Sequence, residues 1–256
     1  ICIRDRHEID SLQNIETVIS TGEPITAKLI VTQLEKRGVE RLMVEGGAAV
    51  LRMFLGEGMA DTLRLAVNPQ LRLGSAGGAE FRFTPPQGTP QTRENLGGME
   101  VTTYTLHPDT SAADLRFLKQ AVDEGRKCTP SATSYCVGAV VVTADGRIFA
   151  GHTHETSPTH HAEQEAIAKA LAAGAALRGA AMYSSMEPCS QRASEPESCT
   201  QLLLKYGFAR AVFALYEPDC FVCCRGALTL REAGVDVRVY PGLAGGVWEA
   251  NAHLKR

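Results

Sequence analysis

The sequence lacks three features that would place it in a specialised class of protein. No apolar run approaches the roughly 20 residues that a membrane-spanning helix needs, and the first residues do not resemble a signal peptide. A basic excess is also absent, because 26 Lys and Arg residues face 29 Asp and Glu residues, giving a formal net charge of −3. Aromatic residues make up 6% of the chain and are not interleaved with basic ones, as they are on surfaces that bind single-stranded nucleic acid. We therefore expect a cytoplasmic protein that binds neither membranes nor nucleic acids.

Cysteine is present but too sparse for a disulfide scaffold. The chain has eight cysteines in 256 residues, and its 44% hydrophobic and 21% charged residues are enough to form a buried core. In a reducing compartment, cysteines are better interpreted as metal ligands or catalytic groups than as structural disulfides. The length allows one large domain or two smaller ones, so the positions of the cysteines among the predicted elements become decisive.

The first half predicts an incomplete α/β unit in which a strand leads through a Gly-Gly turn into a helix. That turn spans Glu45 to Gly47. Turn residues over 107–111 interrupt the pattern, so we divide the chain into domains of residues 1–107 and 108–256. The elements expected before the boundary are a helix over 24–38, a strand over 39–44, a helix over 48–55, a strand over 61–67, a Gly- and Pro-rich connection over 74–98 and a strand over 99–106.

The second half predicts a complete α/β domain with a mixed sheet of about five strands. Asp145-Gly146 is a strong signal for a two-residue hairpin turn. Strands that alternate with helices of about a dozen residues favour an α/β domain with a largely parallel core sheet. The expected elements are a helix over 112–126, strands over 137–143 and 147–150, a helix over 162–173, a strand over 181–185, a helix over 198–206, a strand over 209–215, a helix over 227–233 and a strand over 235–240.

One histidine and two cysteines form the pattern that points to chemistry. His161 opens a predicted helix with Glu163 two residues later, while Cys189 follows a predicted strand and Cys199 completes the set. Three such ligands suit a catalytic Zn²⁺ that keeps its fourth position for water. His160 is a rival ligand, but only His161 keeps the two-residue spacing to Glu163. Because Glu163 stays off the metal, it can pass a proton from that water to a ring nitrogen and then to a leaving amine, which predicts hydrolytic deamination of a heterocycle.

Residues of about 112–256 resemble the cytidine/deoxycytidylate deaminase superfamily, in which the His-x-Glu and Pro-Cys pairs are a signature. They most resemble the pyrimidine deaminase domain of the bifunctional riboflavin biosynthesis deaminase-reductase. Nine residues separate the two cysteines here, where most nucleoside and tRNA deaminases have two. The resemblance implies a three-layer cytidine-deaminase-like fold and an aminopyrimidine that lies against Ser134, Gly138 and Ala139. We also expect a homodimer. The resemblance to this deaminase domain also includes residues 137–142, 217–219, Gly226 and 233–237.

Residues 28–107 resemble the C-terminal part of the partner reductase, whose fold is similar to dihydrofolate reductase. The likeness lies in Val44-Glu45-Gly46-Gly47, in the predicted helix after it and in Gly58-Met59-Ala60-Asp61. In that family the Glu-Gly-Gly turn lies where NADPH and the ribosylamino-pyrimidine meet, and two glycines let a phosphate approach the N–H groups of a helix N-terminus. The resemblance therefore implies NADPH at Glu45, Gly46 and Gly47. The alternative is that these glycines form a turn needed only for packing, without binding a ligand.

Departures from the family leave the substrate open. The domain order is reversed, the reductase-like part has about half its usual length, Ser134 replaces an Asn, and the acidic residues over 195–197 replace a basic run. A deaminase of another nucleobase, nucleoside or heterocycle in specialised metabolism, with a non-catalytic reductase-like domain, is therefore the main alternative. Three further alternatives are a reductase with secondary deaminase activity, a zinc-stabilised interaction module and a nucleic-acid editor. Glu163 argues against the interaction module, because a purely structural zinc site needs no acid/base group beside the metal. The Cys220–Cys224 cluster has no assigned role.

Overall fold

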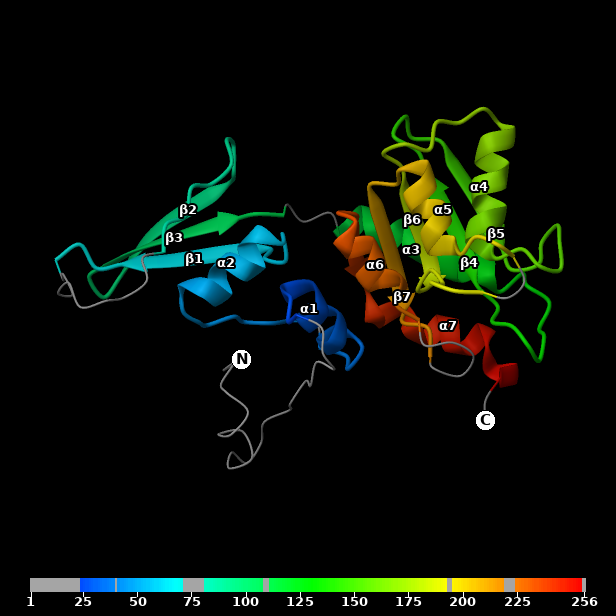
Figure 1. Cartoon of the computed structure of the whole chain (residues 1–256), viewed down its shortest axis with the longest axis horizontal. Helices are drawn as coiled ribbons and strands as arrows, with labels where there is room; N and C mark the ends of the chain where they lie inside the picture. Colours follow the sequence, from blue (N-terminus) through cyan, green and yellow to red (C-terminus); the bar gives the residue numbers. More distant parts are fainter. Residues whose placement is uncertain are drawn as a thin grey trace, which may run out of the picture. The chain divides into compact units, whose positions relative to one another are not determined.

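The computed structural model describes six stretches of the chain, which fall into two compact units. One unit contains the described residues up to 34 and from 41 to 107, and the other contains residues 35–39 and those from 111 onward. Residues 108–110 lie outside the described part, so the boundary between 107 and 108 stays a prediction. The described stretches, which Figure 1 draws in colour, are 24–39, 41–70, 81–107, 111–192, 195–218 and 224–254.

The first unit is a three-stranded antiparallel sheet with two short helices. The strand order is β1-β3-β2, and the only buried hydrophobic cluster described in this unit is centred on Ala27, Ile30 and Phe54. The strand expected over 39–44 is wrong for residues 41–44, which have no regular structure. The elements are α1 (Ala27–Glu35), α2 (Ala48–Gly56), β1 (Thr62–Val67), β2 (Gln91–Leu96) and β3 (Met99–Thr105).

The second unit contains a five-stranded mixed sheet in the order β5-β4-β6-β7-β8. The pairs β5–β4 and β4–β6 are antiparallel, whereas β6–β7 and β7–β8 are parallel. Every helix and strand expected for this half is confirmed, with ends that differ by two residues or fewer. The elements are α3 (Ser111–Gly125), β4 (Gly138–Val142), β5 (Ile148–His152), α4 (Ala162–Ala172), β6 (Ala181–Met186), α5 (Cys199–Tyr206), β7 (Arg210–Leu215), α6 (Gly226–Glu232), β8 (Asp236–Val239) and α7 (Ala244–Ala250).

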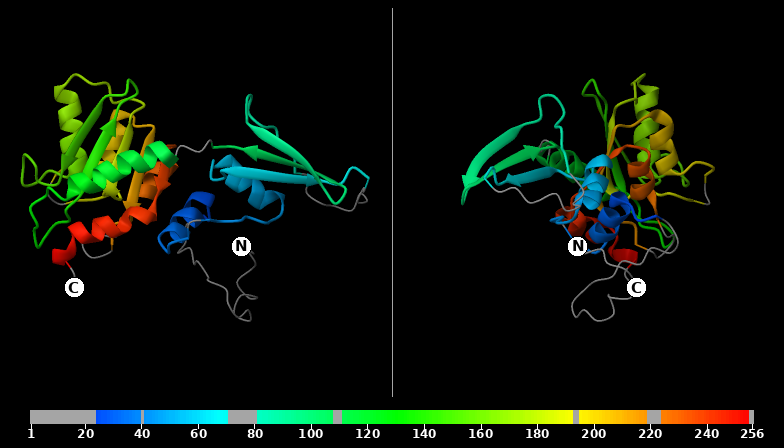
Figure 2. Two further views of the ribbon diagram at one scale, coloured as in Figure 1. Left: turned by 180° about the vertical axis from the view of Figure 1, so that it is seen from behind. Right: turned by 60° about the vertical axis from the view of Figure 1, so that its left-hand side comes forward.

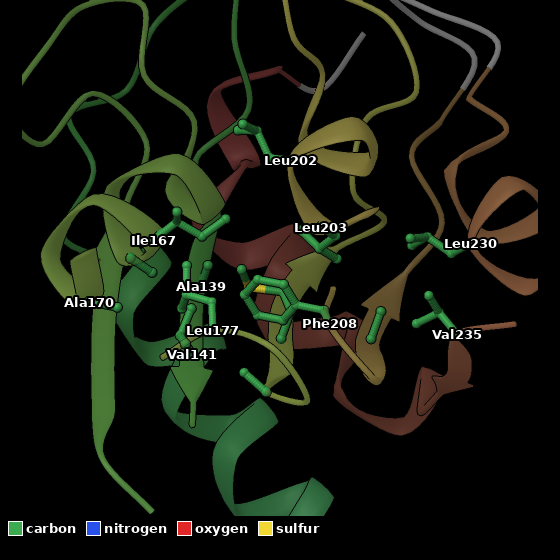
Figure 3. Close-up of a cluster of buried hydrophobic side chains, with 14 of the residues drawn as sticks. Ala139, Val141, Ile167, Ala170, Leu177, Leu202, Leu203, Phe208, Leu230 and Val235 are labelled. Carbon is green, nitrogen blue, oxygen red and sulfur yellow. The ribbon is translucent and has the colours of Figure 1, made fainter. Parts of the chain in front are cut away.

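Helices cover both faces of this sheet, so the predicted three-layer arrangement is confirmed. Alternate residues of β4 point to opposite faces. Ala139 and Val141 belong to a buried cluster that includes residues of α4, α5 and α6, whereas Val140 belongs to a cluster that includes residues of α3 and α7. Figure 3 shows the first cluster, with Phe208 and Leu203 near its centre. In the left view of Figure 2, α3 crosses in front of the strands on the opposite face. Among the described residues, no helix is both long and apolar enough to cross a membrane.

Candidate active site

The predicted zinc ligands lie at the ends of elements in the second unit. His161 is the N-cap residue of α4 but makes no side-chain capping bond, so its ring is free to point elsewhere. Cys199 is the first residue of α5, and Cys189 follows β6. Local structure thus brings one imidazole and two thiols from distant parts of the sequence together.

The three side chains are spaced as ligands of one ion. His161 Nδ1 lies 3.5 Å from Cys189 Sγ and 3.6 Å from Cys199 Sγ, and the three ligand atoms all lie within 4.8 Å of one another. Tetrahedral zinc with its usual bond lengths requires N and S ligands to be roughly 3.5 Å apart. The donor set and its spacing therefore fit Zn²⁺, with room for a fourth ligand.

Glu163 lies beside this cluster in the first turn of α4, and its side chain is buried. Ser184 Oγ donates a hydrogen bond to Glu163 Oε1 over 3.0 Å, while Oε2 lies 3.4 Å from Cys199 Sγ. Burial raises the pKa of the Glu163 carboxyl above its usual value, and the neighbouring Cys189 adds to the shift. A buried carboxyl with a raised pKa next to a metal site is well suited to carry a proton.

Close packing fixes the backbone that carries Cys189. A Cβ atom at Gly226 would lie 1.9 Å from Pro188 O, so only glycine allows α6 to begin this close to the segment. Thr200 Oγ1 donates to the same carbonyl over 3.1 Å, and Thr200 N donates to Cys189 O. The hydrogen bond from the Cys199 thiol lowers the pKa of Cys189, which favours the thiolate that a metal needs.

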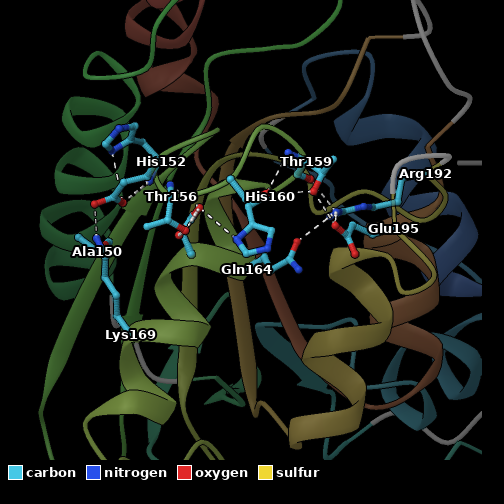
Figure 4. A network of polar contacts seen from close by, with 12 residues as sticks. Ala150, His152, Thr156, Thr159, His160, Gln164, Lys169, Arg192 and Glu195 are labelled. Carbon is cyan, nitrogen blue, oxygen red and sulfur yellow. Dashed lines mark hydrogen bonds and ion pairs between the residues drawn. The ribbon is translucent and has the colours of Figure 1, made fainter.

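His160 is engaged away from the cluster. Its Nδ1 lies 3.2 Å from Glu165 Oε1, and the Glu165 carboxylate also accepts hydrogen bonds from Thr156 N and Oγ1 over 2.9 Å (Figure 4). Glu165 is 1% exposed, so this network is an internal anchor for the loop before α4. The geometry therefore favours His161 over His160 as the metal ligand.

A cavity of about 330 Å³ opens beside the cluster and reaches His161, Glu163 and Cys189. This volume lies within the range of small-molecule sites. Ser134 Oγ is buried at the cavity and has no hydrogen-bond partner within the described residues, so a ligand is an available partner. The remaining lining residues are Thr133, Tyr135, Val137, Thr153, Met186, Glu187, Gln191, Arg192 and Glu217.

The structure does not bring all predicted substrate and cofactor residues to this cavity. Gly138 and Ala139 are outside its lining, and Gly138 instead allows α3 to approach β4, since a Cβ there would lie 2.1 Å from Ala121 O. Ala139 is fully buried in the core.

The Glu-Gly-Gly turn belongs to the first unit, where Glu45, Gly46 and Gly47 are exposed before α2. A Cβ at Gly46 would lie 2.9 Å from Val50 Cβ, so local packing by itself accounts for that glycine. NADPH binding at this turn stays a prediction.

Sequence reasoning missed several cavity residues, and Arg192 is the most consequential of them. Its side chain is only 4% exposed, and it comes three residues after Cys189. Its position between Cys189 and Cys199 could have pointed to Arg192, but a sequence does not reveal which charged side chains become buried.

Two family models match the chain on either side of the predicted boundary. The model of the cytidine and deoxycytidylate deaminase zinc-binding region matches residues 111–215, and the model of the RibD C-terminal domain matches residues 3–104. The reversed order predicted from the sequence is therefore confirmed, because the region named for the C-terminus of RibD comes first.

Curated relatives and solved structures with related names match about half of the chain. A diaminohydroxyphosphoribosylamino-pyrimidine deaminase of Schizosaccharomyces pombe is 41% identical over 123 residues, which is 47% of this chain and 30% of that protein. The riboflavin biosynthesis protein RibD of Chlamydia pneumoniae is 35% identical over 147 residues, or 57% of this chain and 37% of that protein. The chain thus spans only about a third of the length of these relatives.

Among solved structures, a Thermotoga maritima diaminohydroxyphosphoribosylaminopyrimidine deaminase/5-amino-6-(5-phosphoribosylamino)uracil reductase is 28% identical with a TM-score of 0.49, covering 54% of this chain and 39% of that one. The Aspergillus oryzae Rib2 deaminase is 26% identical with a TM-score of 0.47, covering 54% of this chain and 89% of that one. The chain is therefore similar to the cytidine and deoxycytidylate deaminase zinc-binding region over residues 111–215 and to the RibD C-terminal domain over residues 3–104, and its curated relatives carry RibD-type names.

Proposed function

We propose that this protein catalyses the zinc-dependent hydrolytic deamination of an aminopyrimidine, as the name of its S. pombe relative describes. The observation that carries the proposal is the convergence of His161, Cys189 and Cys199 within 4.8 Å, with the buried Glu163 carboxyl beside them. A purely structural zinc site takes four protein ligands and needs no proton carrier next to it. Three ligands, a carboxyl and an adjoining cavity are instead what a hydrolytic site requires.

His161, Cys189 and Cys199 would hold the zinc ion, which would lower the pKa of a bound water to about 7. Glu163 takes the proton through Oε2, because Oε1 is held by the Ser184 hydroxyl. It would deliver this first proton to the ring nitrogen of the substrate, and would then take up the second proton of the water from the new hydroxyl group and pass it to the departing amine. The water oxygen forms a bond to the ring carbon, the exocyclic C–N bond breaks, and ammonia leaves.

Ser134 is the residue we propose for orienting the base. Its hydroxyl is buried at the cavity without a described partner, so it can exchange a hydrogen bond with a polar edge of the pyrimidine. Asn251 supports this wall of the cavity from α7. Its side chain accepts from Cys136 N over 2.7 Å and donates to Cys136 O over 3.0 Å, two residues beyond Ser134.

A second function, NADPH binding by the first unit, is favoured by the match to the RibD C-terminal domain. We infer that Glu45, Gly46 and Gly47 would meet the cofactor, since Gly47 is the N-cap residue of α2 and the helix start has no side-chain cap. Fluorescence titration with NADPH tests this inference. A failure to bind would leave the first unit as a non-catalytic region. A cytoplasmic location and a homodimer also remain predictions.

Ammonia release by the zinc-loaded protein tests the deaminase proposal. The panel contains aminopyrimidines, cytosine compounds and guanine compounds, each with and without a ribose phosphate. We expect the aminopyrimidine class to be the best substrates. Turnover of only another heterocycle would overturn the substrate class, and no ammonia from any compound with zinc fully bound would overturn the reaction.

A further inference from the structure

A second group of side chains that can bind a metal lies apart from the candidate active site. Glu124 belongs to α3, His152 is the last residue of β5, and Glu155 lies in the loop before α4. Each offers one ligand atom, and the three atoms lie within 4.8 Å of one another. Figure 4 shows His152 at the opposite end of the polar network from Arg192, which lines the cavity. None of the three residues lines the described cavity or belongs to the candidate zinc cluster, so the group is a separate site.

The ring nitrogen of His152 that faces the two carboxylates has no hydrogen-bond partner. Nδ1 is buried and unpaired among the described residues, and it lies 3.5 Å from Glu124 Oε1 and 3.5 Å from Glu155 Oε2. An N–H···O hydrogen bond is shorter, at about 2.7–3.2 Å. Nitrogen and oxygen ligands about 2.1 Å from one tetrahedral ion are instead roughly 3.4 Å apart. The spacing therefore fits an ion held by the three side chains better than a proton shared by two of them.

Two lysines hold the carboxylates so that one oxygen of each faces the histidine. Lys127 Nζ donates to Glu124 Oε2, and Lys169 Nζ donates to Glu155 Oε1, both over 2.6 Å. In each case the lysine takes the oxygen that does not approach His152 Nδ1, which leaves the other oxygen available. Hydrogen bonds of this kind orient the carboxylates of metal sites.

The lysines do not neutralise the interior of this group. Their side chains are 62% and 39% exposed, so water screens their charges, whereas those of Glu124 and His152 are 11% and 17% exposed. Burial opposes the ionisation of Glu155, but the hydrogen bond from Lys169 keeps the pKa of its carboxyl below the usual value. Two largely buried carboxylates and an imidazole nitrogen are a donor set for a divalent transition-metal ion.

We propose that Glu124, His152 and Glu155 bind a second divalent transition-metal ion, with the chemistry of Zn²⁺. The ion links three parts of the second unit: α3, the end of β5 and the loop that leads to His161. Thr153, which follows His152 in the chain, lines the cavity, so the ion also steadies that wall. Because no thiolate takes part, this site holds its ion more weakly than the cysteine-containing cluster does. The inference is independent of the proposed deaminase function.

Cobalt binding to the protein loaded with one equivalent of Zn²⁺ tests the proposal, because Co²⁺ takes zinc-like ligands and is coloured. The zinc occupies the thiolate cluster, and Co²⁺ does not displace it, since Zn²⁺ binds a given site more tightly. We expect one further ion per chain, with the visible bands of cobalt bound to nitrogen and oxygen. Bound cobalt that shows only the strong ultraviolet band of a cobalt thiolate would overturn the second site, because it would lie at the cysteines.

His152→Gln and Glu155→Gln should each weaken Co²⁺ binding by at least about 10-fold, because each removes one of the ligands, while the zinc content stays unchanged. Glu155→Gln keeps the size of the side chain and an oxygen that can accept from Lys169, so it guards against a variant that fails to fold. His253→Gln and Glu249→Gln are the matched controls, because both residues are exposed and lie outside the group. Both should bind Co²⁺ as the wild type does.

The unfolding temperature gives a second measurement that needs no deaminase activity. Co²⁺ should raise it in the zinc-loaded wild type and in the two controls, but not in His152→Gln or Glu155→Gln. No cobalt bound beside the zinc, or equal binding in the wild type and both ligand variants, would overturn the proposal. The group would then be an ion-pair network around a protonated His152.

Discussion

At the scale of single residues, the candidate site depends on positions where adding one atom to a side chain would change the geometry. Gly226 is the clearest case, because its α-carbon lies against the Pro188 carbonyl immediately before the ligand Cys189. No side chain can be added there without moving one of the two segments.

Gly226→Ala should therefore destabilise the fold by about 1–3 kcal/mol and weaken zinc retention, since the added methyl group displaces the backbone next to Cys189. Urea unfolding and zinc content measure the two effects. Gly245→Ala in α7 is the control, because nothing lies within 4 Å of a Cβ at that position. Equal stability and zinc content in both variants would contradict the packing argument.

The sequence was sufficient to predict which residues gather in the candidate zinc cluster, but not which residues line the cavity. His161, Cys189, Cys199 and Glu163 were found because their residue types and spacing reflect the chemistry directly. Arg192 was not singled out, because its burial in the cavity wall depends on residues from α4 and the preceding loop. Residues that share a sequence motif can therefore be predicted from the sequence alone. The electrostatic state of a side chain cannot, because it depends on the whole fold.

At the scale of elements, α5 presents Cys199 from a well-capped N-terminus. Ser198 Oγ accepts a hydrogen bond from Gln201 N, and the Gln201 side chain accepts one from Ser198 N. This capping box fixes the first turn of the helix, and with it the position of Cys199.

Ser198→Ala should lower the free energy of unfolding by about 1 kcal/mol, because one N–H group at the start of α5 loses its acceptor. Ser198→Asp keeps an acceptor and should stay close to the wild type. Urea unfolding of both variants measures the difference. Indistinguishable midpoints for the two would show that the cap contributes nothing to stability.

The elements of the two halves were predictable to different degrees. In the second unit, the sequence pattern located every element from α3 to β8, because these elements pack around a two-sided core that imposes a regular burial pattern. In the first unit, β2 fell within the connection expected over 74–98, because every residue of β2 is exposed and leaves no alternation to detect. The missed signal was Gly97-Gly98, whose positive φ angles of 58° and 83° form the turn between β2 and β3. Residues 41–44 were predicted as a strand only because of their apolar composition.

At the scale of the whole molecule, zinc is expected to contribute to folding as well as to chemistry. Without an ion, the described partners of the two thiols and the imidazole are one another and the carboxylate of Glu163. A ligand that binds only the folded state stabilises it in proportion to its affinity.

Removing zinc with a strong chelator should therefore lower the unfolding temperature and abolish ammonia release, and added Zn²⁺ should restore both. Mg²⁺ should restore neither, because it prefers oxygen ligands over thiolates. Scanning calorimetry together with the ammonia assay measures the two effects. Unchanged stability and activity in protein verified to be free of zinc would contradict the assigned metal site.

The central claim is that Glu163 carries protons at a zinc site, and the most direct measurement is ammonia release by Glu163→Gln at full zinc occupancy. The variant keeps the size of the side chain and an oxygen that can accept from Ser184, but it cannot take up a proton. We predict bound zinc equal to that of the wild type and a rate of ammonia release lower by at least ~100-fold. A zinc-loaded variant that releases ammonia within a few-fold of the wild-type rate would contradict the account.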